Sequence, residues 1–69
     1  MNNVAAVIST FREGREYTKD DIANRLNTMG FDVPDHKLET ILRRLKRANI
    51  IVGGLIYGRD TMAYRLEDL

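Results

Sequence analysis

Several residue types that would point to other classes of protein are missing or scarce in this chain. It contains no cysteine, no tryptophan, one proline and one histidine among 69 residues. Without thiols it forms neither disulfide bonds nor thiolate metal sites, and one histidine cannot build a structural zinc site. We therefore expect no cofactor and no metal, and the simplest compartment for such a chain is the reducing cytoplasm.

Long apolar runs are absent too. The longest begins at Ile50 and ends at Ile56 with two glycines inside, far short of the about 20 residues that span a membrane. The first residues lack the basic start of a secretion signal and soon reach the charged Arg12. We expect one small domain over residues 1–69 that has no membrane association and buries only about 60% of its unfolded surface.

The sequence also lacks a catalytic constellation. It shows no nucleophile beside a general base and no carboxylate cluster, and Gly53-Gly54 is not followed by the Lys and Ser or Thr of a phosphate loop. Asp20 and Asp21 are adjacent, but the start of a helix explains both because it favours negative charge. We therefore expect a binding domain and no enzymatic activity.

Capping residues and apolar spacing predict two helices in the first half of the chain. The first is expected to begin at Asn2 or Asn3 and to end at Gly14. The second is expected to follow a short extended piece, to begin at Thr18 with an acidic residue at capping-box spacing, and to end at Gly30. Their inner faces are expected to carry Val4, Val7, Ile8, Phe11, Ile22, Leu26 and Met29.

A third helix, expected over residues 35–48, combines an apolar stripe with a basic face. Residues 36–47 carry five basic side chains and one acidic one, although the whole chain has a net charge of +1. The stripe consists of Leu38, Ile41, Leu42 and Leu45. The opposite face carries His36, Thr40, Arg43 and Arg47, flanked by Lys37 and Arg44 on one side and by Glu39 and Lys46 on the other.

The remaining residues predict a β-hairpin. Asn49 suits a left-handed helix end, and β-branched and aromatic residues follow it on both sides of Gly53-Gly54, where a bulge is expected. Residues 58–61 are expected to form the turn. In the return strand, the inward positions are expected to be Met62, Tyr64 and Leu66, alternating with Ala63 and Arg65.

Three segments, in their order and spacing, make the chain resemble a winged helix-turn-helix DNA-binding domain of the small transcriptional-regulator type. They are YTKDDIANRL, LETILRRLKRANII and GLIYGRDTMAYRL, and the resemblance covers residues 4–66. It implies an α+β fold with three helices and a small antiparallel sheet. It also implies a recognition helix at 35–48 in the major groove and a wing near 57–61 on adjacent backbone. Two features depart from the family: Asn49 stands where Gly is common, and the link MGFDVP is long.

The side chains of the third helix suit double-stranded DNA. Arg43, in the middle of the basic face, is the candidate for reading a base because Arg meets the acceptors of guanine bidentately. Lys37, Arg44 and Arg47 are candidates for phosphate contacts. Arg59, in the wing, is either a phosphate or minor-groove contact or an ordinary turn residue. The predicted DNA-binding residues are His36, Lys37, Thr40, Arg43, Arg44, Arg47 and Arg59.

The sequence leaves alternatives to a DNA-binding transcriptional regulator open. The basic face is also what a merely solvated helix would show. A winged-helix module that binds protein rather than a specific DNA sequence is the second hypothesis, through the same face or through the apolar hairpin residues Leu55, Ile56 and Tyr57. Those three residues also suit a homodimer, which would help because a single winged helix buries little DNA surface.

Overall fold

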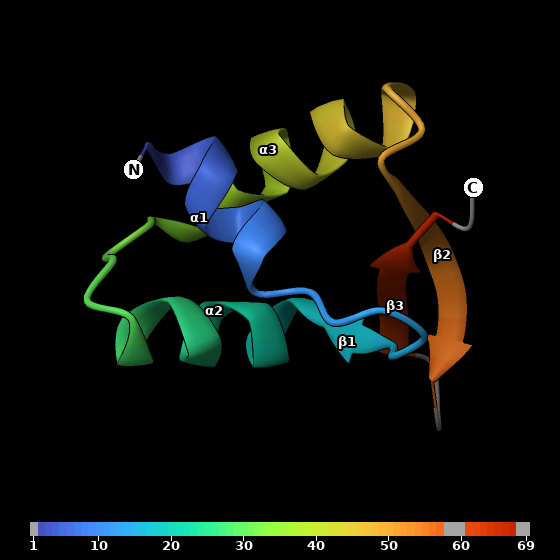
Figure 1. The fold of residues 1–69 in the computed structure, drawn as a ribbon, viewed down its shortest axis with the longest axis horizontal. Coiled ribbons are helices and arrows are strands. Elements are labelled where there is room, and N and C mark those ends of the chain that lie inside the picture. Colours follow the sequence, from blue (N-terminus) through green and yellow to red (C-terminus); the bar gives the residue numbers. More distant parts are fainter. Residues whose placement is uncertain (1, 58–60, 68–69) are drawn as a thin grey trace.

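The structure, a computed structural model, describes residues 2–57 and 61–67. Its elements follow the order helix, strand, helix, helix, strand, strand (Figure 1). They are α1 (Asn3–Ser9), β1 (Tyr17–Thr18), α2 (Lys19–Thr28), α3 (Asp35–Arg47), β2 (Ile51–Tyr57) and β3 (Thr61–Leu66). The predicted α+β architecture, three helices with a small antiparallel sheet, is therefore confirmed.

Helix α1 begins as predicted but ends earlier. The Asn2 side chain accepts a hydrogen bond from the amide of Ala5 at 2.8 Å and caps the first turn. At the other end, the hydroxyl of Thr10 donates to the carbonyl of Val7 at 2.7 Å. Such a bond competes with the hydrogen bonds that would extend the helix. The predicted stop at Gly14 is wrong, and the φ of +77° at this glycine serves a turn farther along the chain.

Helix α2 has the boundaries that its capping residues predict. The amide of Asp21 donates to the Thr18 hydroxyl at 3.1 Å, and the amide of Thr18 donates back to the Asp21 carboxylate at 3.0 Å. This reciprocal capping box satisfies amides that the helix start leaves open. At the other end, Gly30 has a φ of +87° and the amide of Phe31 donates to the carbonyl of Leu26 at 2.9 Å. The chain is thereby turned toward α3.

Helix α3 begins after Pro34, whose carbonyl accepts the first hydrogen bonds of the helix. It ends at residue 47, where Asn49 takes the predicted left-handed conformation with a φ of +61°. The amide of Ile50 then donates to the carbonyl of Leu45 at 3.0 Å, which closes the helix end. The apolar stripe is buried as predicted, with exposed fractions of 1–6% at Leu38, Ile41, Leu42 and Leu45.

The sheet is antiparallel, in the order β1-β3-β2. Between β2 and β3 the register shifts by one residue, because Val52 lies opposite Arg65 whereas Leu55 lies opposite Ala63. The extra residue falls at the predicted bulge, where Gly54 has a φ of +78°. The hairpin is thus bent between Val52 and Leu55, in the first half of β2.

Two predicted inward positions are wrong. Met29 is 40% exposed, because it follows the last residue of α2 and the side chain of Phe31 packs against the core after the turn. Met62 is 54% exposed, whereas the neighbouring Ala63 is fully buried. The other two predicted inward positions of β3, Tyr64 and Leu66, do pack against the core, so the predicted face is right there and only Met62, near the start of the strand, is wrong.

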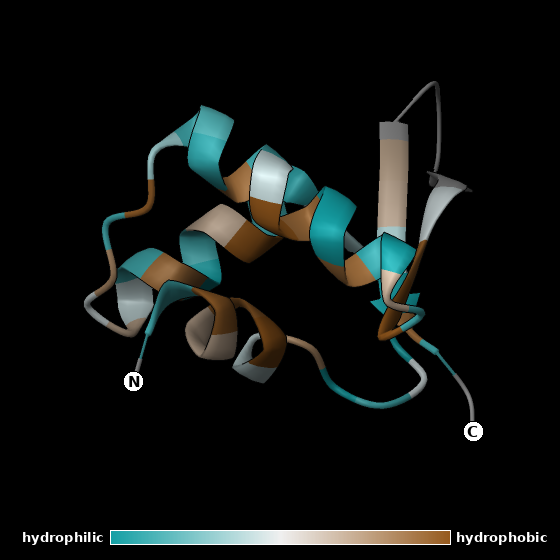
Figure 2. Ribbon diagram, turned by 90° about the horizontal axis from the view of Figure 1, so that it is seen from above, coloured by the Kyte–Doolittle hydropathy of each residue, from teal (hydrophilic) through white to brown (hydrophobic). Residues whose placement is uncertain are grey.

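The helices enclose one core, and the hairpin stands at one end of them. In Figure 1 the hairpin lies beside the end of α3 and the start of α2. Figure 2 shows brown and teal segments alternating along the helices, as amphipathic helices around a shared core require. Within the described residues, none of the helices is long and apolar enough to cross a membrane. The largest fully buried side chains are Val7, Thr10, Ile22, Leu26, Leu38, Leu42 and Ile51.

Candidate nucleic-acid interface

The outward face of α3 is basic and open to solvent. Burial of the apolar stripe turns the opposite side of the helix outward, as its spacing predicts. The hydroxyl of Thr40 donates to the carbonyl of His36 at 3.0 Å, which still leaves its oxygen able to accept a hydrogen bond. The six predicted side chains of this face are all exposed, namely His36, Lys37, Thr40, Arg43, Arg44 and Arg47.

The seventh predicted DNA-binding residue, Arg59, lies outside the described residues. The backbone of Leu55, Ile56 and Tyr57 pairs with β3 as a hairpin should, but their side chains also lie outside what the structure describes. Their predicted role as an apolar partner surface therefore stays a prediction, as does the contact that Arg59 would make with DNA.

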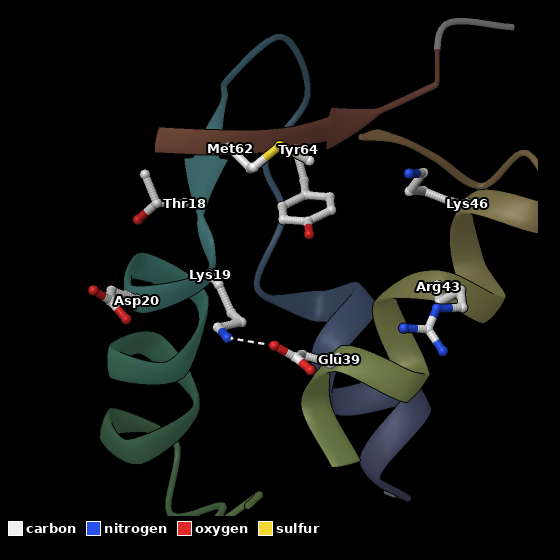
Figure 3. Close-up of a pocket in the computed structure, with 8 residues that line it drawn as sticks. All are labelled: Thr18, Lys19, Asp20, Glu39, Arg43, Lys46, Met62 and Tyr64. Carbon is white, nitrogen blue, oxygen red and sulfur yellow. Dashed lines mark hydrogen bonds and ion pairs between the residues drawn. The ribbon is translucent and has the colours of Figure 1, made fainter. Parts of the chain in front are cut away.

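An open pocket of about 530 Å³ lies where α2 begins, beside α3 and β3. Among the six predicted DNA-binding side chains of α3, Arg43 is the one that lines it. Figure 3 shows the ring of Tyr64 reaching from β3 into the space between the two helices. The lining residues are Thr18, Lys19, Asp20, Glu39, Arg43, Lys46, Met62 and Tyr64. The pocket thus adjoins the basic face on the side of the hairpin.

Lys19 joins the two helices on the wall of this pocket. Its Nζ lies 2.8 Å from Oε1 of Glu39 and 3.1 Å from each carboxylate oxygen of Asp35. The side chains of Lys19 and Glu39 are 31% and 51% exposed. Hydrogen bonds to Glu39 and then to Asp35 stabilise the ammonium group, and so they raise the pKa of Lys19 above its ordinary value. The start of α2 is thereby tied to the first turns of α3.

Lys46 and Tyr64 form another wall of the pocket. A methyl group placed on Gly53 would lie 2.5 Å from Cδ of Lys46 and 2.8 Å from Cε1 of Tyr64. The aliphatic stem of Lys46 therefore lies along the glycine of β2, as expected for a lysine at the edge of an apolar stripe. Lys46 and Arg43 line the same pocket.

Sequence reasoning did not find the pocket residues Lys19, Glu39, Lys46 and Tyr64 as members of one site. From the sequence, Tyr64 is expected to be a core residue of the return strand, and no pattern singles out Lys19. The one feature of the sequence that pointed to this site was Glu39, the only acidic residue of the basic segment 36–47. In the structure its partner is Lys19, which comes from a different helix.

Among the described residues, no three His, Asp or Glu side chains gather closely enough to hold a metal ion. No protein-family model matches the chain, and no curated protein matches it either. Its structure is similar to one of the ferric uptake regulator from Francisella tularensis with iron, with a TM-score of 0.82. The fold is a winged helix-turn-helix.

The likeness to this regulator is one of fold, since the two chains are 17% identical in sequence. The similarity covers 99% of the present chain and 53% of the regulator's chain. The chain therefore corresponds to about half the length of that protein. The predicted winged-helix architecture is confirmed, and the order of α2, α3 and the β2–β3 hairpin is the one that the resemblance implied.

Proposed function

We propose that this winged-helix domain binds double-stranded DNA and regulates transcription by occupying a site. One observation carries the proposal: α3 buries its whole apolar stripe and turns the six predicted DNA-binding side chains outward, four of them Lys or Arg. A face of this kind suits the phosphates and base edges of a duplex. The likeness in fold to a regulator supports the same function.

In the proposed complex, α3 lies in the major groove, which admits a helix of this size. Arg43 lies in the middle of the exposed face and meets a base edge, whereas Lys37, Arg44 and Arg47 meet phosphates on either side. The hairpin and Arg59 contact the adjacent backbone. His36 and Thr40 contribute hydrogen bonds near the start of the helix. The domain acts in the cytoplasm as a binding protein, and a homodimer would extend its contact with DNA.

A duplex-binding titration at two salt concentrations tests the proposal. Neutralising phosphates releases counterions, so affinity falls steeply as salt rises. If three to five charges are neutralised, the log–log slope between about 50 and 200 mM salt is near −3 to −5 per protomer, and twice that for a dimer. Undetectable binding at about 50 mM salt, with folded protein in micromolar excess, would overturn the proposal.

A matched pair of double variants shows whether binding uses the face of α3. Arg43→Ala/Arg47→Ala removes two positive charges from that face, and Arg12→Ala/Arg15→Ala removes two from the exposed segment between α1 and β1. We expect the first pair to weaken binding strongly and to flatten the salt slope by about one, because Arg47 is the phosphate contact of the two, and the second pair to change binding little. Equal effects of both pairs on duplex binding would indicate that DNA is attracted by the net charge of the protein and not by the face of α3. A winged-helix module that binds protein instead would show neither effect.

A further inference from the structure

Glu39 is the one carboxylate among the basic residues of 36–47, and it faces the pocket beside the DNA-binding face. A carboxylate at this place would be repelled by DNA phosphates if its charge were unbalanced. Lys19 balances it, with Nζ 2.8 Å from Oε1. Among the described residues, Oε2 of Glu39 has no hydrogen-bond partner. One carboxylate oxygen is therefore held while the other can still accept a hydrogen bond.

Glu39 and Arg43 lie one helical turn apart and line the same pocket. Figure 3 shows Lys19 reaching Glu39 from α2, with Arg43 farther along α3 on the other side of Glu39. The side chain of Glu39 is 51% exposed, so its free oxygen can be reached from outside. The pair therefore offers an acceptor and a fork of donors next to each other, on the helix proposed to enter the major groove.

In the major groove, cytosine presents an amino group at N4, and guanine presents acceptors at N7 and O6. A carboxylate accepts from the amino group, and arginine donates to the two guanine acceptors. We propose that Glu39 is a specificity-determining residue that accepts a hydrogen bond from a cytosine, with Arg43 on a guanine in the same or the next base pair. Lys19 is the positioning residue that holds Glu39. This inference rests on the proposed DNA-binding function.

The competing explanation is that the ion pair only ties α2 to α3. Asp35 shows what such a purely structural partner looks like, because it also binds Lys19 but lies at the first residue of α3 with a side chain 72% exposed. Glu39 differs in lying within the helix and lining the pocket beside Arg43. A structural tie affects affinity for all duplexes alike. A reading role changes the preference at one base position, and this difference is the basis of the test.

The test uses a pool of duplexes with a randomised core, from which the bound fraction is recovered and sequenced. Wild-type protein is expected to enrich a motif that contains a C·G pair, with cytosine favoured about tenfold or more at one position. Glu39→Gln is expected to shift that position from cytosine to adenine, because an amide pairs with N6 and N7 of adenine. Glu13→Gln, an exposed carboxylate before β1 that does not line the pocket, is the matched control and should leave the motif unchanged.

Lys19→Met tests the positioning role, and Lys19→Arg tests whether a conservative cation restores it. We expect Lys19→Met to lower the preference for cytosine several-fold and Lys19→Arg to retain most of it. A motif that is the same for wild type and Glu39→Gln would overturn the role of Glu39 while leaving the DNA-binding proposal intact. Uniformly weaker binding by Lys19→Met, with the preference unchanged, would overturn the role of Lys19. If wild type binds duplexes in the salt titration but enriches no motif, the role of Glu39 is overturned and DNA binding stands; if it binds no duplex, both proposals fail.

Discussion

Arg25 lies over the ring of Tyr17, with its Cζ 5.5 Å from the ring centroid. The Nε of the same guanidinium donates to the carbonyl of Thr10 at 2.9 Å. The Tyr17 ring also meets Phe11 edge to face, with centroids 5.7 Å apart. This cluster joins the end of α1, the start of the sheet and α2, since cation–π and aromatic contacts both add to simple burial.

The hydroxyl of Tyr17 is buried and has no hydrogen-bond partner among the described residues. Leaving such a group unpaired costs about 1–3 kcal/mol. Tyr17→Phe keeps the ring contacts and removes the unpaired oxygen, so we expect it to raise the free energy of unfolding by about 1 kcal/mol. Urea denaturation measures the change. Loss of more than about 1 kcal/mol would mean that the hydroxyl has a partner, such as a bound water.

Leu42 lies in the middle of the buried stripe of α3, with 1% of its surface exposed. Leu42→Ala removes buried methyl groups and leaves a cavity, which costs about 2–5 kcal/mol and would unfold much of a small domain. Thr40→Ala, on the exposed side of the same helix, is the control and should change stability by about 0.5 kcal/mol or less. Similar midpoints of denaturation for both variants would show that α3 is turned the other way.

Short-range rules predicted the helix ends well, apart from the stop of α1 at Gly14, because each rule rests on residues within one turn. The capping box of α2 needs only the spacing of Thr18 and Asp21, and the left-handed Asn49 and Gly30 follow from local backbone sterics. The stripe of α3 is likewise visible from its period. These features decide which side of α3 is outward, and so the basic face was predictable before the fold was known.

The same rules did not predict contacts between residues far apart in the sequence. The alternation of β3 holds at Tyr64 and Leu66, which pack against the core, but not at Met62, which lies near the start of the strand and is 54% exposed. The tie between Lys19 and Glu39 joins residues 20 positions apart on different helices, so no helical or strand period relates them. The pocket depends on this tie and on the bend of the hairpin, and neither follows from the residues of one element alone.

Gly53 is required by the close packing of the hairpin against α3. A methyl group at this position would lie 2.8 Å from the Tyr64 ring and 2.5 Å from the Lys46 stem. The lysine can move aside more easily than the ring, so Gly53→Ala should destabilise the domain by about 1–3 kcal/mol. Adding Lys46→Ala should restore little of this loss. Full recovery in the double variant would identify the lysine stem, rather than the tyrosine, as the obstacle.

The capping box of α2 should be measurable through Thr18. Thr18→Ala removes the hydroxyl that accepts from the amide of Asp21, which costs about 0.5–2 kcal/mol. Thr28→Ala is the matched control, because this hydroxyl is at the opposite end of α2 and donates to a carbonyl already in the helix. We expect the control to change the free energy of unfolding by about 0.5 kcal/mol or less. Equal losses of unfolding free energy in both variants would show that the capping box adds no stability beyond that of an ordinary threonine hydroxyl in the helix.

Arg43 and Arg47 both lie on the exposed face of α3, but they are expected to differ in what they contact. Arg43 lines the pocket beside Glu39, whereas Arg47 is the last residue of the helix. Arg43→Ala should cost about 1–3 kcal/mol on the selected duplex and little on unrelated ones, because it removes contacts to a base. Arg47→Ala should weaken binding to every duplex by a similar factor and reduce the salt slope by about one. Titrations of both variants with the selected and a scrambled duplex compare these patterns. If Arg43→Ala weakens both duplexes equally, Arg43 contacts phosphate, and the base-reading position must lie elsewhere on the face.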